Sequence, residues 1–183
     1  MMYLSKGAPV LSDPFRVSQC GKVYELGPRL AGLWHKGRTR PVQVESEQER
    51  AIMRMAEAGL VAVSREEGSL ASFQMLNGCI LCPSYRRQFR LPIYGCARRV
   101  WKWVRGAGLK LTTSELIRLE ELGTQPSPEL LGDAGRQALT ETIYNHTNIL
   151  DGDLEMEMER SPARDVTVTA ILKLLRTHRL LLI

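Results

Sequence analysis

The chain has 183 residues, of which 44% are apolar and 25% are charged, and its formal net charge is +5. These values are typical of a globular protein with one or two domains, and they exclude collagen, disulfide-stabilised miniproteins and wholly disordered chains. No apolar run approaches the ~18 residues that a membrane-spanning helix needs, and residues 1–11 lack the pattern of a secretion signal. We therefore expect a cytoplasmic protein without a membrane partner.

The first half of the chain predicts extended segments followed by two helices. Residues 1–22 are extended in pattern. A helix is expected within residues 23–36, where apolar side chains recur at helical spacing and Pro28 suits the first turn. A second helix is expected after Ser46 and Glu49, because their S-x-x-E spacing is that of a capping box.

A β-hairpin is expected next, formed by residues 60–63 and 70–76. The order helix, turn, helix and hairpin is that of a winged helix, and the segment MAEAGLVAV at residues 55–63 resembles the end of its last helix and the start of its wing. This resemblance to the winged-helix superfamily covers about residues 23–76 and identifies no specific family. It implies DNA as a partner, since the helix before the wing often enters the major groove. Winged-helix modules found beside peptide-modifying enzymes bind a peptide as an added strand, so a peptide partner is the alternative.

The second half predicts several helices and a last strand. Residues 79–92 contain two cysteines and two prolines and predict a linker. Thr112 and Glu115 have capping-box spacing, and residues 179–183 predict a strand. We therefore expect a mostly helical α+β protein with tandem winged-helix-like halves and short β-hairpins. Its parts would be a winged-helix-like domain at 1–78, the linker, and a helical, second winged-helix-like domain at 93–183.

Charge is strongly polarised along the chain. Residues 68–114 contain eight basic residues and no acid, whereas residues 115–165 contain twelve acids and four bases. A basic segment neutralises phosphates and releases counterions, which is the main source of non-specific nucleic-acid affinity. The alternative is that the basic segment pairs with the acidic one. The first interpretation predicts a nucleic-acid-binding transcription regulator with these contacts: Arg86, Arg87, Arg90, Arg98, Arg99, Lys102 and Arg105.

A protein interface is a second hypothesis. Trp101 and Trp103, taken as exposed, would anchor a protein or peptide partner, because aromatic residues are frequent anchors of interfaces. The apolar residues Leu180, Leu181 and Leu182 would add a strand to a sheet of this chain or of a partner, and a homo-oligomer joined there is a related alternative. The two tryptophans could instead be core residues.

The cysteines offer a third hypothesis. Cys79 and Cys82 form a C-x-x-C pair, and Cys96 follows fourteen residues later, so the three could ligate zinc. The alternatives are buried apolar cysteines, which are common, or a redox pair. We find no P-loop, no G-x-G-x-x-G, no H-E-x-x-H and no G-x-S-x-G in the sequence. The sequence therefore predicts a binding protein and not an enzyme.

Overall fold

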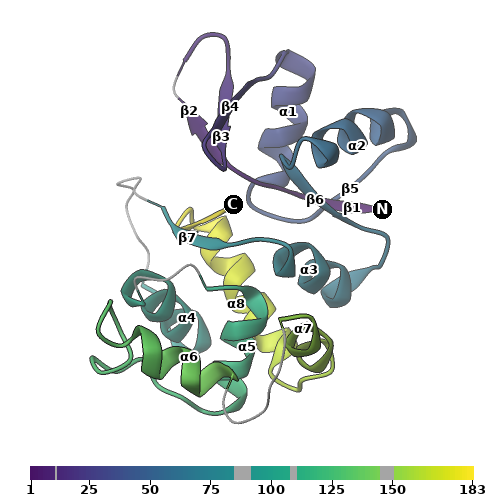
Figure 1. Cartoon of the computed structure of the whole chain (residues 1–183). Coiled ribbons are helices and arrows are strands. Elements are labelled where there is room, and N and C mark those ends of the chain that lie inside the picture. The colour runs from purple at the N-terminus through teal and green to yellow at the C-terminus, as the bar shows by residue number, and fades with distance from the viewer. Residues whose placement is uncertain (11, 85–91, 108–110, 145–150) are drawn as a thin grey trace.

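The structure is a computed structural model that describes residues 1–10, 12–84, 92–107, 111–144 and 151–183. Figure 1 shows the N-terminal strands and helices above a helical part that contains α3 to α8. The fold class is α+β and mostly helical, as expected. No helix in the described ranges is long and apolar enough to cross a membrane.

The N-terminal part holds two small antiparallel sheets and two helices. In one sheet β1 is central, with β5 and β6 on either side, and in the other β3 lies between β2 and β4. The bounds are β1 Met2–Ser5, β2 Ala8–Val10, β3 Arg16–Gln19, β4 Lys22–Glu25, α1 Pro28–Gly37, β5 Val42–Gln43, the 3-10 turn η1 Ser46–Gln48, α2 Glu49–Glu57 and β6 Val61–Ser64.

The β3–β4 hairpin turns through Cys20 and Gly21, whose φ angles of 47° and 79° are both positive. Two successive residues with positive φ are the requirement of a type I′ turn, which matches the twist of a two-residue hairpin. The exposed Cys20 therefore lies at the tip of a hairpin. Residues 1–22, predicted as extended, contain the strands β1, β2 and β3.

Helix α1 packs closely against β1. It begins at Pro28 and ends at Gly37, as predicted. A Cβ atom at Gly37 would lie 2.5 Å from the Tyr3 ring, so only glycine permits this approach. The Tyr3 hydroxyl donates a hydrogen bond of 2.8 Å to the carbonyl of Leu33. Tyr3 and Trp34 are both fully buried in the core of the N-terminal part.

The hairpin predicted from residues 60–63 and 70–76 does not form. Strand β6 pairs with β1, and residues Gly68–Asn77 form a helix, α3. Ala71, Ser72, Met75 and Leu76 are buried, and this spacing places them on one side of a helix. A short apolar run fits either a strand or a buried helix, and here burial against the C-terminal helices favours the helix.

The C-terminal part is built of helices around one apolar core. That core includes α3 as well as residues from α4, α5 and α8. The bounds are β7 Leu81–Pro83, α4 Gly95–Gly106, α5 Thr113–Glu121, α6 Arg136–Tyr144, α7 Asp151–Glu159, α8 Arg164–Arg176 and β8 Leu180–Leu182.

The predicted C-terminal strand is confirmed, and its partner is in the same chain. β8 pairs antiparallel with β7, with Leu81 opposite Leu182 and Pro83 opposite Leu180. Leu180 and Leu182 are buried and Leu181 is half-buried. Of the two alternatives for this strand, a sheet of this chain or of a partner, the structure shows the first. The segment predicted as a linker, residues 79–92, contributes β7 to this sheet.

The two parts meet at Lys6 and Gly7, which follow β1. The backbone N–H of Gly7 donates to the carbonyl of Leu182 at 2.7 Å, and Lys6 Nζ donates to the carbonyl of Gly78 at 3.0 Å. On the other side, Trp34 Nε1 donates to the carbonyl of Lys6 at 2.9 Å. These bonds tie the last strand and the end of α3 to the N-terminal part.

The two predicted capping boxes have different outcomes. At α5, Glu115 N–H donates to Thr112 Oγ1 at 3.2 Å and Thr112 N–H donates to Glu115 Oε2 at 2.6 Å, so this box is confirmed. The box predicted at Ser46 and Glu49 is wrong, because Ser46 lies inside η1 and α2 begins at Glu49 without a side-chain cap.

Candidate nucleic-acid interface

Helix α4 carries the described part of the basic segment. Its inner face is apolar and buried, with Val100, Trp103 and Val104 in the C-terminal core. Arg98, Lys102 and Arg105 are exposed. Positions separated by four and then three residues share one side of a helix. We call these three side chains the α4 basic face.

The α4 basic face has no acidic partner in the part of the chain that the structure describes. None of its three side chains forms an ion pair or a side-chain hydrogen bond with a residue that the structure describes. They border a hollow of about 650 Å³, here called the α4 hollow, and its described lining residues include no Asp or Glu. The other lining residues are Ile93, Trp101, Gly106, Pro126, Pro128 and Leu131. Three cations thus surround a largely apolar depression.

The far wall of the α4 hollow comes from the loop between α5 and α6. The N–H of Gly132 donates to the carbonyl of Gly106, the last residue of α4, at 2.7 Å. A Cβ atom at Gly106 would lie 3.0 Å from Leu131, so the absence of a side chain there lets Leu131 approach. This contact fixes the loop and its two prolines beside the helix.

Arg99 is a structural residue, although the sequence predicts it as a contact for nucleic acid. Its guanidinium forms two hydrogen bonds with the Glu120 carboxylate of α5, and the Nε–Oε2 distance is 3.0 Å. The hydrogen bond to Glu120 raises the pKa of Arg99, so its charge is fixed and already partnered. Arg99 therefore links α4 to α5, and its charge is already paired within the chain.

The two tryptophans of α4 are not exposed. Trp103 is 3% exposed and Trp101 is 9% exposed, so they are not the exposed side chains that the interface hypothesis assumes, and the alternative of core residues fits them. Their spacing places them on the core side of α4 with Val100 and Val104. The guanidinium of Arg179 lies over the Trp101 ring, 5.9 Å from its centroid. What remains accessible of Trp101 contributes to the α4 hollow.

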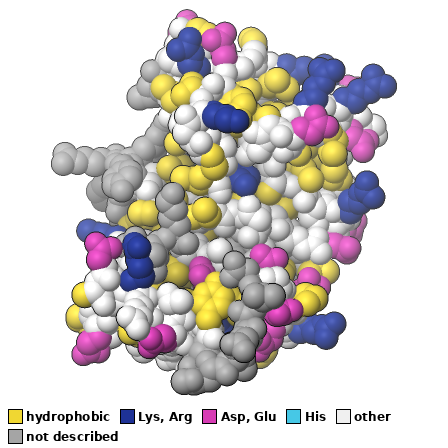
Figure 2. All heavy atoms as spheres, viewed as in Figure 1, with side chains coloured by type: hydrophobic (Ala, Val, Ile, Leu, Met, Phe, Trp, Pro, Cys, Tyr) yellow, Lys and Arg dark blue, Asp and Glu magenta, His cyan; other side chains and the backbone are white. Residues whose placement is uncertain are grey.

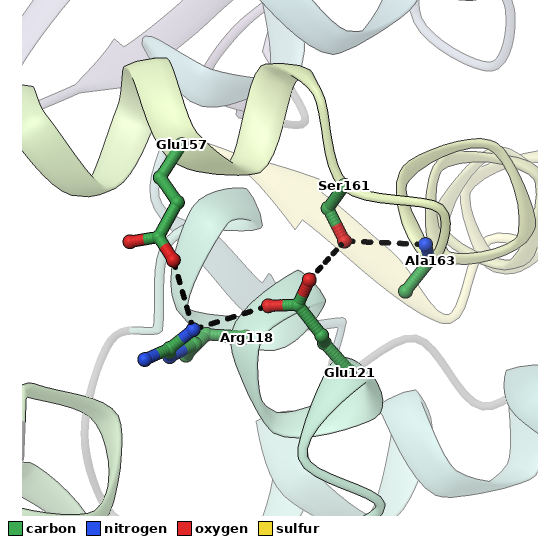
Figure 3. A network of polar contacts seen from close by, with 5 residues as sticks. All are labelled: Arg118, Glu121, Glu157, Ser161 and Ala163. Atoms are coloured by element: carbon green, nitrogen blue, oxygen red, sulfur yellow. Dashed lines mark hydrogen bonds and ion pairs between the residues drawn. The ribbon is translucent and has the colours of Figure 1, made fainter.

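Several acids of the acidic segment pair with bases of the same segment. Arg118 pairs with Glu121 at 3.2 Å and with Glu157 at 3.1 Å, which joins α5 to α7. Figure 3 shows this network continuing from Glu121 to the hydroxyl of Ser161, which accepts from the N–H of Ala163 just before α8. Among described residues, only Arg99 of the basic segment forms an ion pair with the acidic one. The polarity seen in the sequence therefore persists on the surface of α4.

Some basic side chains elsewhere in the molecule lie near acidic ones. Figure 2 shows Lys and Arg side chains beside Asp and Glu side chains over the upper part, where α1 and α2 lie. On α2, Arg50 and Arg54 border a hollow of about 690 Å³ together with Glu49 and Glu57. That hollow is balanced in charge, unlike the one on α4.

Of the seven predicted basic contacts, four lie within the described residues and three do not. Arg86, Arg87 and Arg90 fall outside the described residues. Of the others, the structure brings Arg98, Lys102 and Arg105 together and assigns Arg99 to an ion pair.

The cysteines are not arranged as a ligand set. Cys79 is buried, and its Sγ donates to the carbonyl of Met75 at 3.0 Å. Burial raises the pKa of the Cys79 thiol to about 11, against the opposing effect of Lys6, which disfavours the thiolate that a metal requires. Burial and the Glu120 carboxylate also raise the pKa of Cys96. Within the described ranges, no three His, Cys, Asp or Glu side chains are grouped to hold a metal.

Sequence reasoning missed the α4 hollow. Its far wall is formed by Pro126, Pro128 and Leu131, which are remote from α4 in the sequence and carry no charge pattern. The only local signal is the pair of prolines, and prolines indicate a loop without saying where it packs.

Comparison of the chain with protein-family models, with curated proteins and with solved structures gives no match. A function has therefore to be inferred from the chain's own residues.

Proposed function

We propose that this protein is a nucleic-acid-binding module whose α4 basic face contacts phosphates. The observation that carries the proposal is the set of three exposed cations, Arg98, Lys102 and Arg105, at the rim of a hollow without acids. A polyanion gains most from cations that have no partner in the free protein, because no internal ion pair has to be broken. The proposed contacts are phosphate contacts, which give affinity without reading sequence.

The rigidity of α4 supports the same role. The helix is fixed to the core by its apolar face and to α5 by the Arg99–Glu120 pair. Its three cations therefore start from a fixed backbone, and only their side chains lose freedom on binding. The role of a transcription regulator in the cytoplasm, which the sequence predicts, stays a prediction.

The test is fluorescence anisotropy with a labelled strand of about 12 nucleotides, near the site size of small binding domains. We compare the wild type with Arg98→Ala/Lys102→Ala and with the matched control Arg50→Ala/Arg54→Ala, which removes two exposed arginines at the same spacing from α2. The expected result is a loss of about tenfold in affinity for the α4 variant at low salt, since two phosphate contacts are removed. The control should bind nearly as well as the wild type. Equal losses in both variants would contradict the proposal.

A further inference from the structure

We propose that the α4 hollow holds an unpaired base, so that the protein prefers single-stranded nucleic acid to a duplex. This inference rests on the proposed function and specifies its ligand. The hollow measures about 650 Å³ and is open to solvent. A duplex offers phosphates on a convex surface with its bases stacked inside. A single strand offers bases whose apolar faces can leave water.

The distribution of charge and apolar surface fits a nucleotide. The cations of the α4 basic face stand on the helix side of the hollow, while Pro126, Pro128 and Leu131 supply apolar surface on the loop side. Trp101, which lies between Arg98 and Lys102 in sequence, is also part of the lining. An anionic ligand with a flat apolar body satisfies both surfaces, and a nucleotide with its phosphate has this chemistry.

A second aromatic side chain stands at the start of α4. Tyr94 is 70% exposed and precedes Arg98 by four residues. Aromatic side chains stack on unpaired bases in proteins that bind single strands. Because Tyr94 directly follows Ile93 of the hollow lining in the sequence, the proposal includes stacking of Tyr94 on a base next to the one in the hollow.

The first experiment needs no variant and uses the full chain. Affinities are measured by anisotropy for three labelled probes with the same number of phosphates per strand: an oligothymidine of about 12 nucleotides, an abasic strand of equal length, and a duplex of that length. We expect the oligothymidine to bind about tenfold more tightly than the abasic strand, because stacked bases contribute beyond phosphate contacts. Equal binding of the oligothymidine and the abasic strand would overturn the inference.

Variants then locate the base. Pro128→Glu places a carboxylate in the α4 hollow, while Gln125→Glu adds the same charge in the same loop outside the lining. We expect Pro128→Glu to remove the preference for the oligothymidine over the abasic strand, and Gln125→Glu to retain it. Tyr94→Ala alters only an exposed side chain, and we expect it to weaken oligothymidine binding about fivefold, the lower end of the stacking effect.

The outcomes separate this inference from the proposed function. If all three probes bind with affinities that depend on the α4 basic face, but neither Pro128→Glu nor Tyr94→Ala changes the preference among them, the base site is wrong and phosphate binding stands. If no probe binds even at about 50 mM salt, where phosphate contacts are strong, the proposed function fails and the inference fails with it.

Discussion

Helices α2 and α4 border two hollows that are similar in size but differ in the charge of their lining residues. The α2 hollow, about 690 Å³, is bordered by Arg50 and Arg54 but also by Glu49 and Glu57. The described residues that border the α4 hollow, about 650 Å³, include three cations and no acid. Counting basic residues along the chain would not separate them. The difference shows that the local balance of charge, and not the presence of arginine on a helix, distinguishes a candidate binding face.

The two helices are held in the same way, by their inner faces. Trp103 of α4 is buried in the C-terminal core, and Met55 of α2 is buried in the N-terminal core. We expect Trp103→Ala to lower the free energy of unfolding by about 3–5 kcal/mol and Met55→Ala by about 2–5 kcal/mol, from lost burial and the cavity that remains. Urea unfolding followed by circular dichroism measures both.

The same pair of variants sharpens the comparison of the two faces. Under conditions where both variants remain folded, Met55→Ala should keep the wild-type affinity for nucleic acid, while Trp103→Ala should weaken it, since the α4 basic face depends on the placement of its helix. Trp103→Phe, which keeps an aromatic ring in the core, is the control. Loss of binding in Met55→Ala alone would reverse the assignment of the two helices.

A smaller effect is expected at the two S/T-x-x-E sites. Thr112 caps α5, which also carries Glu120, the partner of Arg99 on α4. Ser46, near the start of α2, makes no cap bond. We expect Thr112→Ala to lower the free energy of unfolding by about 1 kcal/mol and Ser46→Ala to leave it nearly unchanged, because only the first loses a capping hydrogen bond. Equal changes in thermal or urea unfolding would refute this distinction.

The smallest effect comes from making α2 resemble α4. Glu49→Gln/Glu57→Gln removes the two acids from the α2 hollow and leaves Arg50 and Arg54 in place. If local charge balance decides binding, affinity for nucleic acid should rise by about threefold at low salt, because the repulsion between the two carboxylates and phosphate is removed. Anisotropy titration measures the change, and an unchanged affinity would show that charge balance alone does not explain the difference between the helices.

The sequence predicts the fold best where a local signal and burial agree. The helix from Pro28 to Gly37, the capped helix after Thr112 and the last strand all carry such signals and are confirmed. Residues 70–76 fail because their apolar run has no decisive period, and packing against the C-terminal helices selects α3. The failed cap at Ser46 shows that a capping pattern does not fix where the first helical turn begins.

The sequence predicts the basic segment of the site but not which of its cations are paired. The absence of acids from residues 68–114 draws attention to α4, where three of the four described cations form no ion pair with a described residue. Which cations stay unpaired does depend on contacts: Arg99 meets Glu120 across two helices, while its neighbour Arg98 lines the α4 hollow. Trp101 and Trp103 are buried because they lie on the same side of α4 as Val100 and Val104. This spacing is present in the sequence, but it is interrupted by the charged residues of the helix.

The most direct test of the central claim is the dependence of nucleic-acid affinity on salt between about 50 mM and about 200 mM. Each phosphate contact to a single strand contributes about −0.7 to the slope of log affinity against log salt concentration. We predict that Arg98→Ala/Lys102→Ala makes the slope shallower by about 1.4 relative to the wild type. Arg50→Ala/Arg54→Ala should leave it unchanged. A wild-type slope in the α4 variant, or an equal change in both variants, would contradict the assignment of phosphate binding to the α4 basic face.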